Sequence, residues 1–177
     1  MSRAGIKATL GRVPRPFDDP QSIAPGPNSD RILIFGAGLV VGWGVSTHEL
    51  ALPGFLARSL SSLTGRGSDV ELVADPDNLL QNALRQLNAL PLWRYDALVV
   101  VLGVNEALQL APLKAWRRNL AALLTGLEET FAGKPVVVAG IQRIRSIPVY
   151  DSMLGGIADH QATMFNRASA QICAQTV

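Results

Sequence analysis

Four short apolar segments alternate with longer amphipathic segments along this chain, and this alternation constrains the fold more than any other feature. The apolar segments lie at 32–35, 70–74, 97–102 and 135–139. The run at 32–35 is continuously apolar, which is typical of a strand that is buried on both faces of a sheet, and the other three segments are similar to it. Because a helical segment follows each run, the pattern predicts right-handed crossover connections. We therefore expect an α/β protein, a three-layer α/β/α sandwich with an open, mostly parallel sheet.

The four predicted helices are recognised by apolar residues spaced three and four positions apart. They cover about 52–60, 79–87, 113–127 and 157–174. Four strand–helix units are too few to close an eight-stranded barrel, so the sheet is open. Ligands of open α/β sheets bind beyond the carboxyl ends of the strands. The residues that directly follow each strand are therefore the candidates for a functional site.

The first 30 residues differ in composition from the rest of the chain. They contain five prolines together with Gly, Ser and mixed charges. Such a segment buries too little apolar surface to offset the entropy of ordering it. We therefore predict a flexible arm over 1–30 and a single domain over 31–177.

The sequence stops soon after the last predicted helix, where this class of fold would continue into a further strand. Without that strand, the run at 135–139 would form an unpaired apolar edge, which folded proteins usually avoid. The pattern therefore predicts a truncated domain, a strand supplied by a partner, or self-association through the exposed edge.

Composition excludes several classes of protein. The 177 residues are 48% hydrophobic and carry 16 Lys and Arg against 14 Asp and Glu, which gives a net charge of +2. This excess is too small and scattered for a nucleic-acid partner. No apolar run approaches the roughly 18–20 residues of a membrane span, so no membrane insertion is expected. Residues 1–25 lack a secretory apolar core, and the single cysteine, Cys173, forms no internal disulfide. We expect a cytoplasmic protein.

A glycine-rich loop follows the first strand and allows two interpretations. In the first, Gly36, Gly38 and Gly42 form the loop of a Rossmann-type dinucleotide-binding domain, where glycines let the backbone approach a pyrophosphate at a helix N-terminus. Against this, Pro53 indicates that the helix begins well after the loop. The expected ribose-binding acid is also missing at about 20 residues beyond the glycines.

In the second interpretation, the segment resembles the first block of the SGNH (GDSL-type) hydrolases, esterases with a flavodoxin-like fold. Members of that family have a strand, then Gly-Asp-Ser-Leu, a Gly-x-Gly turn and a helix with an early proline. Here the corresponding residues are Gly36-Ala37-Gly38-Leu39, Gly42-Trp43-Gly44 and Pro53. The resemblance places Ala37 at the aspartate and Gly38 at the nucleophilic serine. A glycine has no oxygen, so covalent catalysis at position 38 is chemically impossible.

The third predicted strand ends in a second block that resembles this family. Leu102-Gly103-Val104-Asn105-Glu106 is similar to the family's Gly-x-Asn-Asp. The resemblance implies that Gly103 lies beside the substrate and that the Asn105 amide donates to an oxyanion, the role of a preorganised donor. The structural alternative is that Asn105 caps the next helix, with Glu106 in its first turn.

The remaining blocks of the family are degenerate here. The segment 74–80 contains no glycine, Pro76 has no N–H, and Asp77 adds negative charge near the expected oxyanion pocket. Alternatively, Asp77 or Asn78 caps the following helix. No Asp-x-x-His pair occurs, and neither His48 nor His160 has an aspartate three residues before it. Neither histidine is therefore expected to act as a general base.

Two arginines follow the fourth predicted strand. Arg143 and Arg145 are placed to bind an anion such as a carboxylate on the ligand face, or they are solvated loop residues. The resemblance implies hydrolase ancestry with acyl or acetyl esters as the substrate class. Because Gly38 replaces serine, we expect an impaired enzyme or a non-catalytic binding module for a small ester or acylated ligand. No cofactor and no metal are expected.

Overall fold

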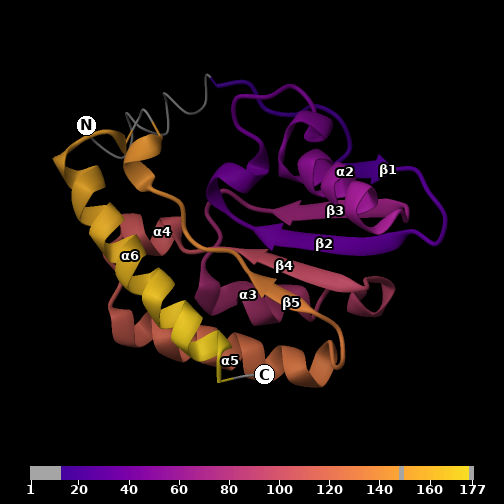
Figure 1. Cartoon of the computed structure of the whole chain (residues 1–177). Coiled ribbons are helices and arrows are strands. Elements are labelled where there is room, and N and C mark those ends of the chain that lie inside the picture. The colour runs from indigo at the N-terminus through magenta and orange to yellow at the C-terminus, as the bar shows by residue number, and fades with distance from the viewer. Residues whose placement is uncertain (1–12, 148–149, 176–177) are drawn as a thin grey trace.

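A computed structural model describes residues 13–147 and 150–175 of the chain. These residues form one five-stranded sheet and its covering helices (Figure 1). The strands are β1 (Gln21–Ala24), β2 (Asp30–Gly36), β3 (Ser68–Ala74), β4 (Ala97–Val101) and β5 (Val136–Val138). The α-helices are α2 (Leu52–Thr64), α3 (Leu80–Leu87), α4 (Val104–Leu108), α5 (Leu113–Thr130) and α6 (Met153–Cys173).

The sheet has the strand order β1-β3-β2-β4-β5. β2 pairs in parallel with both β3 and β4, and β5 adds in parallel to β4. All four parallel strands correspond to apolar runs identified from the sequence. Their carboxyl ends lie along one edge of the molecule, so the loops that follow them are brought together. The expected open, mostly parallel sheet is confirmed.

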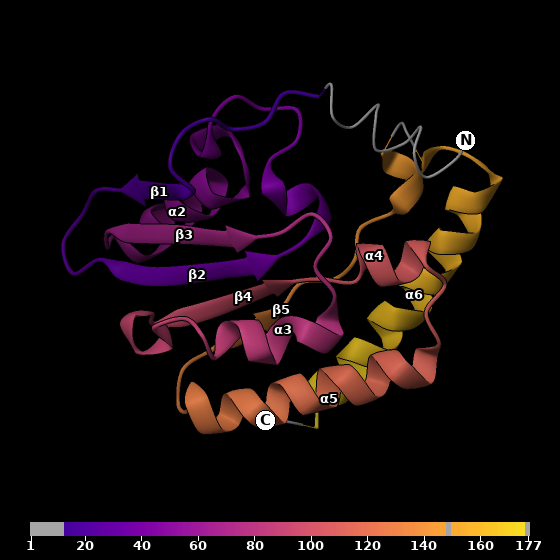
Figure 2. The same cartoon turned by 180° about the vertical axis from the view of Figure 1, so that it is seen from behind.

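Helices cover both faces of the sheet, as the alternation predicts (Figure 2). On one face, α2 packs against β1 and β3 through Ala57, over the buried residues Ile34 and Val70. On the other face, α3, α5 and α6 enclose the larger core. Trp116 of α5 stacks on Phe165 of α6 with their ring centroids 4.6 Å apart. The fold is therefore the predicted three-layer α/β/α sandwich.

The predicted arm contributes a strand that the sequence pattern does not reveal. β1 pairs antiparallel with β3, from Gln21 opposite Glu71 to Ala24 opposite Ser68. The sheet therefore begins before residue 31, where the composition places the start of the domain. The hydrophobic pattern of β1 is inverted, because Ser22 is buried whereas Ile23 is 58% exposed. Residues 1–12 of the predicted arm lie outside the described residues.

Candidate functional site at the carboxyl ends of the strands

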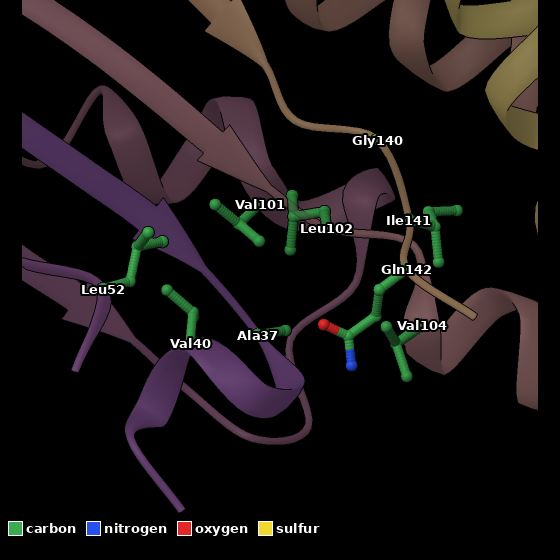
Figure 3. Close-up of a pocket in the computed structure, with 9 residues that line it drawn as sticks. All are labelled: Ala37, Val40, Leu52, Val101, Leu102, Val104, Gly140, Ile141 and Gln142. Carbon is green, nitrogen blue, oxygen red and sulfur yellow. The ribbon is translucent and has the colours of Figure 1, made fainter. Parts of the chain in front are cut away.

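A pocket of about 210 Å³ opens where β2, β4 and β5 end (Figure 3). Apart from Gln142, the residues that line it have apolar side chains or, at Gly140, no side chain. The lining residues come from the last residue of β4, from the segments that follow these three strands and from the start of α2: Ala37, Val40, Leu52, Val101, Leu102, Val104, Gly140, Ile141 and Gln142. The pocket therefore occupies the position at which open α/β sheets bind ligands.

Gln142 supplies the only polar side chain among the residues that line this pocket. Figure 3 shows its amide directed toward Ala37 and Val104. Sequence reasoning selected the neighbouring Arg143 instead, and Arg143 is exposed and does not line the pocket. The second candidate arginine, Arg145, lies 3.0 Å from the carboxylate of Asp151. A glutamine in a loop carries no sequence signal of its own, so only its position reveals it.

Of the two residues predicted from the resemblance at the first strand end, Ala37 lines the pocket, and Gly38 follows it in sequence without lining the pocket. The backbone N–H of Ala37 donates to the carbonyl of Val101 at 2.9 Å. Gly38 is buried at the start of a short 3-10 helix with φ of 67°. A Cβ built on Gly38 would contact Val104 at 3.6 Å, an ordinary van der Waals distance. A side chain at position 38 would therefore point toward a residue of the pocket wall.

Gly103 lies in the turn between β4 and α4, at the N-cap position of α4. Its φ is 114°, a value that favours glycine. A Cβ at this position would also lie 2.8 Å from the ring of Trp116 and overlap the side chain of Ile141. Gly103 therefore places Val104 at the pocket by a turn that no larger residue makes without strain.

Asn105 binds the loop between β3 and α3 instead of pointing into open space. Its Nδ2 donates to the carbonyl oxygens of Pro76 at 2.8 Å and Asn78 at 2.9 Å. A side-chain amide has two N–H donors. Both donors of Asn105 are therefore engaged with the backbone of this loop.

Glu106 lies directly after Asn105 and forms a hydrogen bond with the start of α3, next to the same loop. Its Oε1 accepts a hydrogen bond from the backbone N–H of Leu80, at the start of α3, at 2.5 Å. Its Oε2 is buried and has no partner within the described part of the chain. Burial raises the pKa of Glu106, although the hydrogen bond from Leu80 acts in the opposite direction. The start of α3 is thus capped from a distant segment.

This arrangement corrects the expected capping by Asp77 or Asn78. The N-cap position of α3 is Leu79, which makes no side-chain capping bond. Asp77 is exposed in the turn before α3, and its backbone N–H donates to the Asp75 carboxylate at 2.9 Å. Asn78 is buried, and its side-chain oxygen accepts from the N–H of Leu79. Asp77 does not line the pocket.

The structure pairs His48 with an aspartate that the sequence gives no reason to select. Nδ1 of His48 lies 2.8 Å from Oδ1 of Asp18, and His48 is only 7% exposed. His160, in contrast, is exposed on α6. The family-type spacing of aspartate and histidine is absent, but a carboxylate–imidazole pair nevertheless forms between the N-terminal segment and the loop before α2.

The glycine-rich loop does not have the geometry of a dinucleotide-binding site. Gly38 begins a 3-10 helix that ends at Val41, and α2 begins only at Leu52. Gly42 packs against Pro16, since a Cβ on Gly42 would lie 2.7 Å from that ring. No α-helix N-terminus directly follows β2, so the feature that binds a pyrophosphate in such domains is missing from this loop.

Neither a metal-binding cluster nor a helix able to cross a membrane occurs among the described residues. No group of three or more His, Cys, Asp or Glu side chains is arranged there to hold a metal ion. In the same residues, no helix combines the length and apolarity that crossing a membrane requires.

Comparison with known proteins finds similarity at the level of structure. The sequence matches no protein-family model and no curated protein. AlinE4, a SGNH-hydrolase family esterase, matches with a TM-score of 0.57 and 22% identity over 80% of this chain and 75% of that chain. The lipase/acylhydrolase from Enterococcus faecalis matches with a TM-score of 0.61 and 17% identity over 83% and 72%.

An acetyl xylan esterase from Geobacillus stearothermophilus, solved as a variant of Axe2, gives a TM-score of 0.62. Its identity is 13%, over 85% of this chain and 74% of that chain. Identities this low show common architecture and leave the chemistry to be argued from the site. The protein has the α/β/α fold of the SGNH-type hydrolases.

Proposed function

We propose that this protein is a non-hydrolytic SGNH-like module that binds a small ester or acylated ligand in the pocket at the carboxyl ends of β2, β4 and β5. The observation that carries the proposal is Gly38. It lies against Val104 of the pocket wall, where the resemblance expects a nucleophilic serine. A ligand in the pocket would therefore meet no attacking oxygen at this position.

The residues at the positions of the family's oxyanion donors also have no free N–H group for an oxyanion. Hydrolysis by the serine mechanism needs donors aimed at the developing negative charge. Both N–H groups of Asn105 donate to backbone carbonyls, and Pro76 has no N–H to offer. These observations support ligand binding without acyl transfer.

The pocket suits a small ligand with one polar group. Its volume of about 210 Å³ is below the roughly 300–1,000 Å³ of sites for drug-sized molecules. The walls of Ala37, Val40 and Val104 favour a short alkyl or acyl chain. The amide of Gln142 can donate to an ester carbonyl, and the exposed Arg143 beside it would attract a carboxylate at the rim.

Thermal-shift measurements test the binding. Ethyl butyrate should raise the melting temperature of the wild-type protein, since a ligand at 100 times its Kd stabilises by about 2.7 kcal/mol. Val104→Phe, which puts a larger side chain into the pocket wall, should abolish this shift, whereas Leu50→Phe on an exposed surface should retain it. No stabilisation of the wild type, or an equal shift in Val104→Phe, would contradict the proposal.

Turnover of nitrophenyl acetate tests the absence of hydrolysis. Wild type and Asn105→Ala should both react at the rate of buffer alone. Gly38→Ser should also remain at that rate, because it restores the oxygen but not the oxyanion donors. Gly38→Ala controls for the strain of any side chain at a φ of 67°. Enzymatic turnover by the wild type would overturn the proposal, and a nitrophenolate burst in Gly38→Ser alone would contradict the account of Asn105.

A further inference from the structure

The chain that follows β5 leaves the sheet before it reaches the pocket. Its last hydrogen bond to β4 runs from the N–H of Ala139 to the carbonyl of Val100 at 2.9 Å. The next three residues, Gly140, Ile141 and Gln142, line the pocket (Figure 3). No backbone group in the described part of the chain hydrogen-bonds the N–H or the carbonyl of Ile141. The sheet therefore does not determine the course of the backbone along this wall of the pocket.

Asn166 of α6 binds Ile141 in the way that a neighbouring strand would. Its Oδ1 accepts the N–H of Ile141 at 2.8 Å, and its Nδ2 donates to the carbonyl of the same residue at 2.8 Å. These two groups belong to the two planar peptide units on either side of the Ile141 Cα atom. Because both units are held, the φ and ψ angles of Ile141 are fixed, and with them the direction in which the chain continues to Gln142.

The side chains of Ile141 and Gln142 leave the loop on opposite sides, as Figure 3 shows. Ile141 is buried in the larger core, so close to Gly103 that a Cβ on that glycine would overlap its side chain. Gln142 is exposed and lines the pocket, so a ligand can reach its amide. Since an exposed side chain is not held by packing, the direction of the Gln142 amide depends on the backbone at Ile141.

One face of α6 holds this loop at two points. Asp159 lies seven residues before Asn166, so both side chains lie on the same face of the helix. The carboxylate of Asp159 accepts the N–H groups of Ile144 and Arg145. Neither Ile144 nor Arg145 lines the pocket, whereas Ile141 does. Of these contacts, only that of Asn166 reaches a residue of the pocket.

We propose that Asn166 is the positioning residue of this pocket and sets, through Ile141 and Gln142, its preference for a ligand that carries a carbonyl group. The proposal rests on the proposed function, because it takes the pocket as the ligand site. Asn166 does not line the pocket, so it acts only through the backbone of Ile141. Without Asn166, the apolar walls remain, but the segment that carries the single polar side chain is released. Affinity for a carbonyl-bearing ligand should fall, whereas affinity for a matched ligand without the carbonyl should not.

Calorimetric titration with two ligands tests this preference. Ethyl butyrate and butyl ethyl ether have the same chain and the same alkoxy oxygen, but only the ester has a carbonyl. The wild type should bind the ester more tightly by on the order of fivefold, which corresponds to one net hydrogen bond. Gln142→Leu and Asn166→Ala should both abolish this preference. Asn166→Asp, which has nearly the same shape but no N–H for the Ile141 carbonyl, should abolish it as well.

Gln161→Ala is the matched control on the same helix. It removes the hydrogen bond from Gln161 Nε2 to the carbonyl of Ala111 at 2.6 Å, and Ala111 does not line the pocket. This variant should retain the preference for the ester, even where its loss of stability in urea equals that of Asn166→Ala. A general weakening of α6 would remove the preference in both variants, which would overturn the proposal.

Hydrogen exchange gives a second readout that needs no ligand. The Ile141 amide should exchange about tenfold faster in Asn166→Ala than in the wild type or Gln161→Ala, because it loses its acceptor. Unchanged exchange at Ile141, or a preference for the ester that survives in Asn166→Ala, would overturn the proposal. A wild type that binds neither ligand would contradict the proposed function and with it the carbonyl preference. Exchange at Ile141 would then still decide whether Asn166 holds the loop.

Discussion

The carboxylate of Asp18 binds His48 at two points, across 30 residues of sequence. Its two oxygens accept the backbone N–H of His48 at 3.0 Å, and Oδ1 lies 2.8 Å from the ring Nδ1. A second hydrogen bond holds the same N-terminal segment, because the N–H of Gly44 donates to the carbonyl of Pro14 at 2.9 Å. These hydrogen bonds hold the N-terminal segment against the loop between Gly38 and α2.

This contact predicts a defined dependence of stability on pH. Desolvation opposes ionisation of Asp18, but the hydrogen bonds from the His48 backbone and ring outweigh it, so the pKa of Asp18 lies below its ordinary value of 3.8. A lowered folded-state pKa stabilises the protein above the unfolded pKa, and this contribution is lost as the pH falls through the folded value. The wild type should therefore have a higher melting temperature than Asp18→Asn at about pH 6. This difference should disappear as the pH falls below 3.8.

Asp19→Asn is the matched control, because it removes a neighbouring carboxylate, whereas the hydrogen bonds and the ion pair of His48 are made with Asp18. Its pH profile should follow that of the wild type. Identical profiles for wild type and Asp18→Asn would show that the pair does not contribute to stability.

Glu106 should have the opposite pH dependence. Burial raises its pKa above 4.5, so the folded state holds its proton more tightly than the unfolded state does. The resulting stabilisation is present below pH 4.5 and is lost as the pH rises through the folded pKa. The melting temperature of Glu106→Gln relative to that of the wild type should therefore rise as the pH increases from 4.5 to neutrality. The exposed Glu129→Gln should not, and a flat difference for Glu106→Gln would refute the assignment.

Removing the Asn105 amide should destabilise the protein through the loop before α3. Asn105→Ala loses two hydrogen bonds, each with a net contribution of about 0.5–1.5 kcal/mol. Urea denaturation should show a loss of about 1–3 kcal/mol, with faster hydrogen exchange in residues 76–80. Asn82→Ala, at a partly exposed position on α3, should cost less than half as much. Equal losses for the two variants would argue against a special role for Asn105.

Gly103→Ala should be more harmful than the same change at another glycine with positive φ. At Gly103, a Cβ meets Ile141 and Trp116, whereas at Gly133, with φ of 73°, it meets open space. Backbone strain alone costs about 1–2 kcal/mol, and crowding in a packed core adds about 1–3 kcal/mol. Chemical denaturation should therefore separate the two variants by at least 1 kcal/mol, and similar losses would contradict the crowding at Gly103.

Much of the fold is predictable because the central strands and the helices have strong local patterns. The run Ile32 to Phe35 is buried on both faces of the sheet, and each residue there has at most 3% exposure. The predicted helices all form, although α6 begins at Met153, earlier than the apolar spacing indicates. The boundaries differ because capping decides them, and here the Ser152 side chain accepts the N–H of Gly155 at 3.2 Å.

The candidate site is predictable in place but not in detail. Residues directly after the strands do form the pocket, as the open sheet requires. The partners of Asn105 and Glu106, and the approach of Gln142, involve segments that are distant in sequence. A local pattern cannot encode which carbonyl an amide will meet, because that depends on how the connecting loops pack.

The sequence by itself determined the alternating strand–helix order, the parallel sheet it requires, and the absence of an attacking oxygen at Gly38. These follow from local hydrophobic periodicity and from covalent chemistry, which need no tertiary context. The tertiary structure alone decided that Ser22 and Ile23 belong to a strand, that Asp18 binds His48, and that both donors of Asn105 are engaged. Each of these depends on a partner at least 27 residues away, and only the packed core brings such partners within hydrogen-bonding distance.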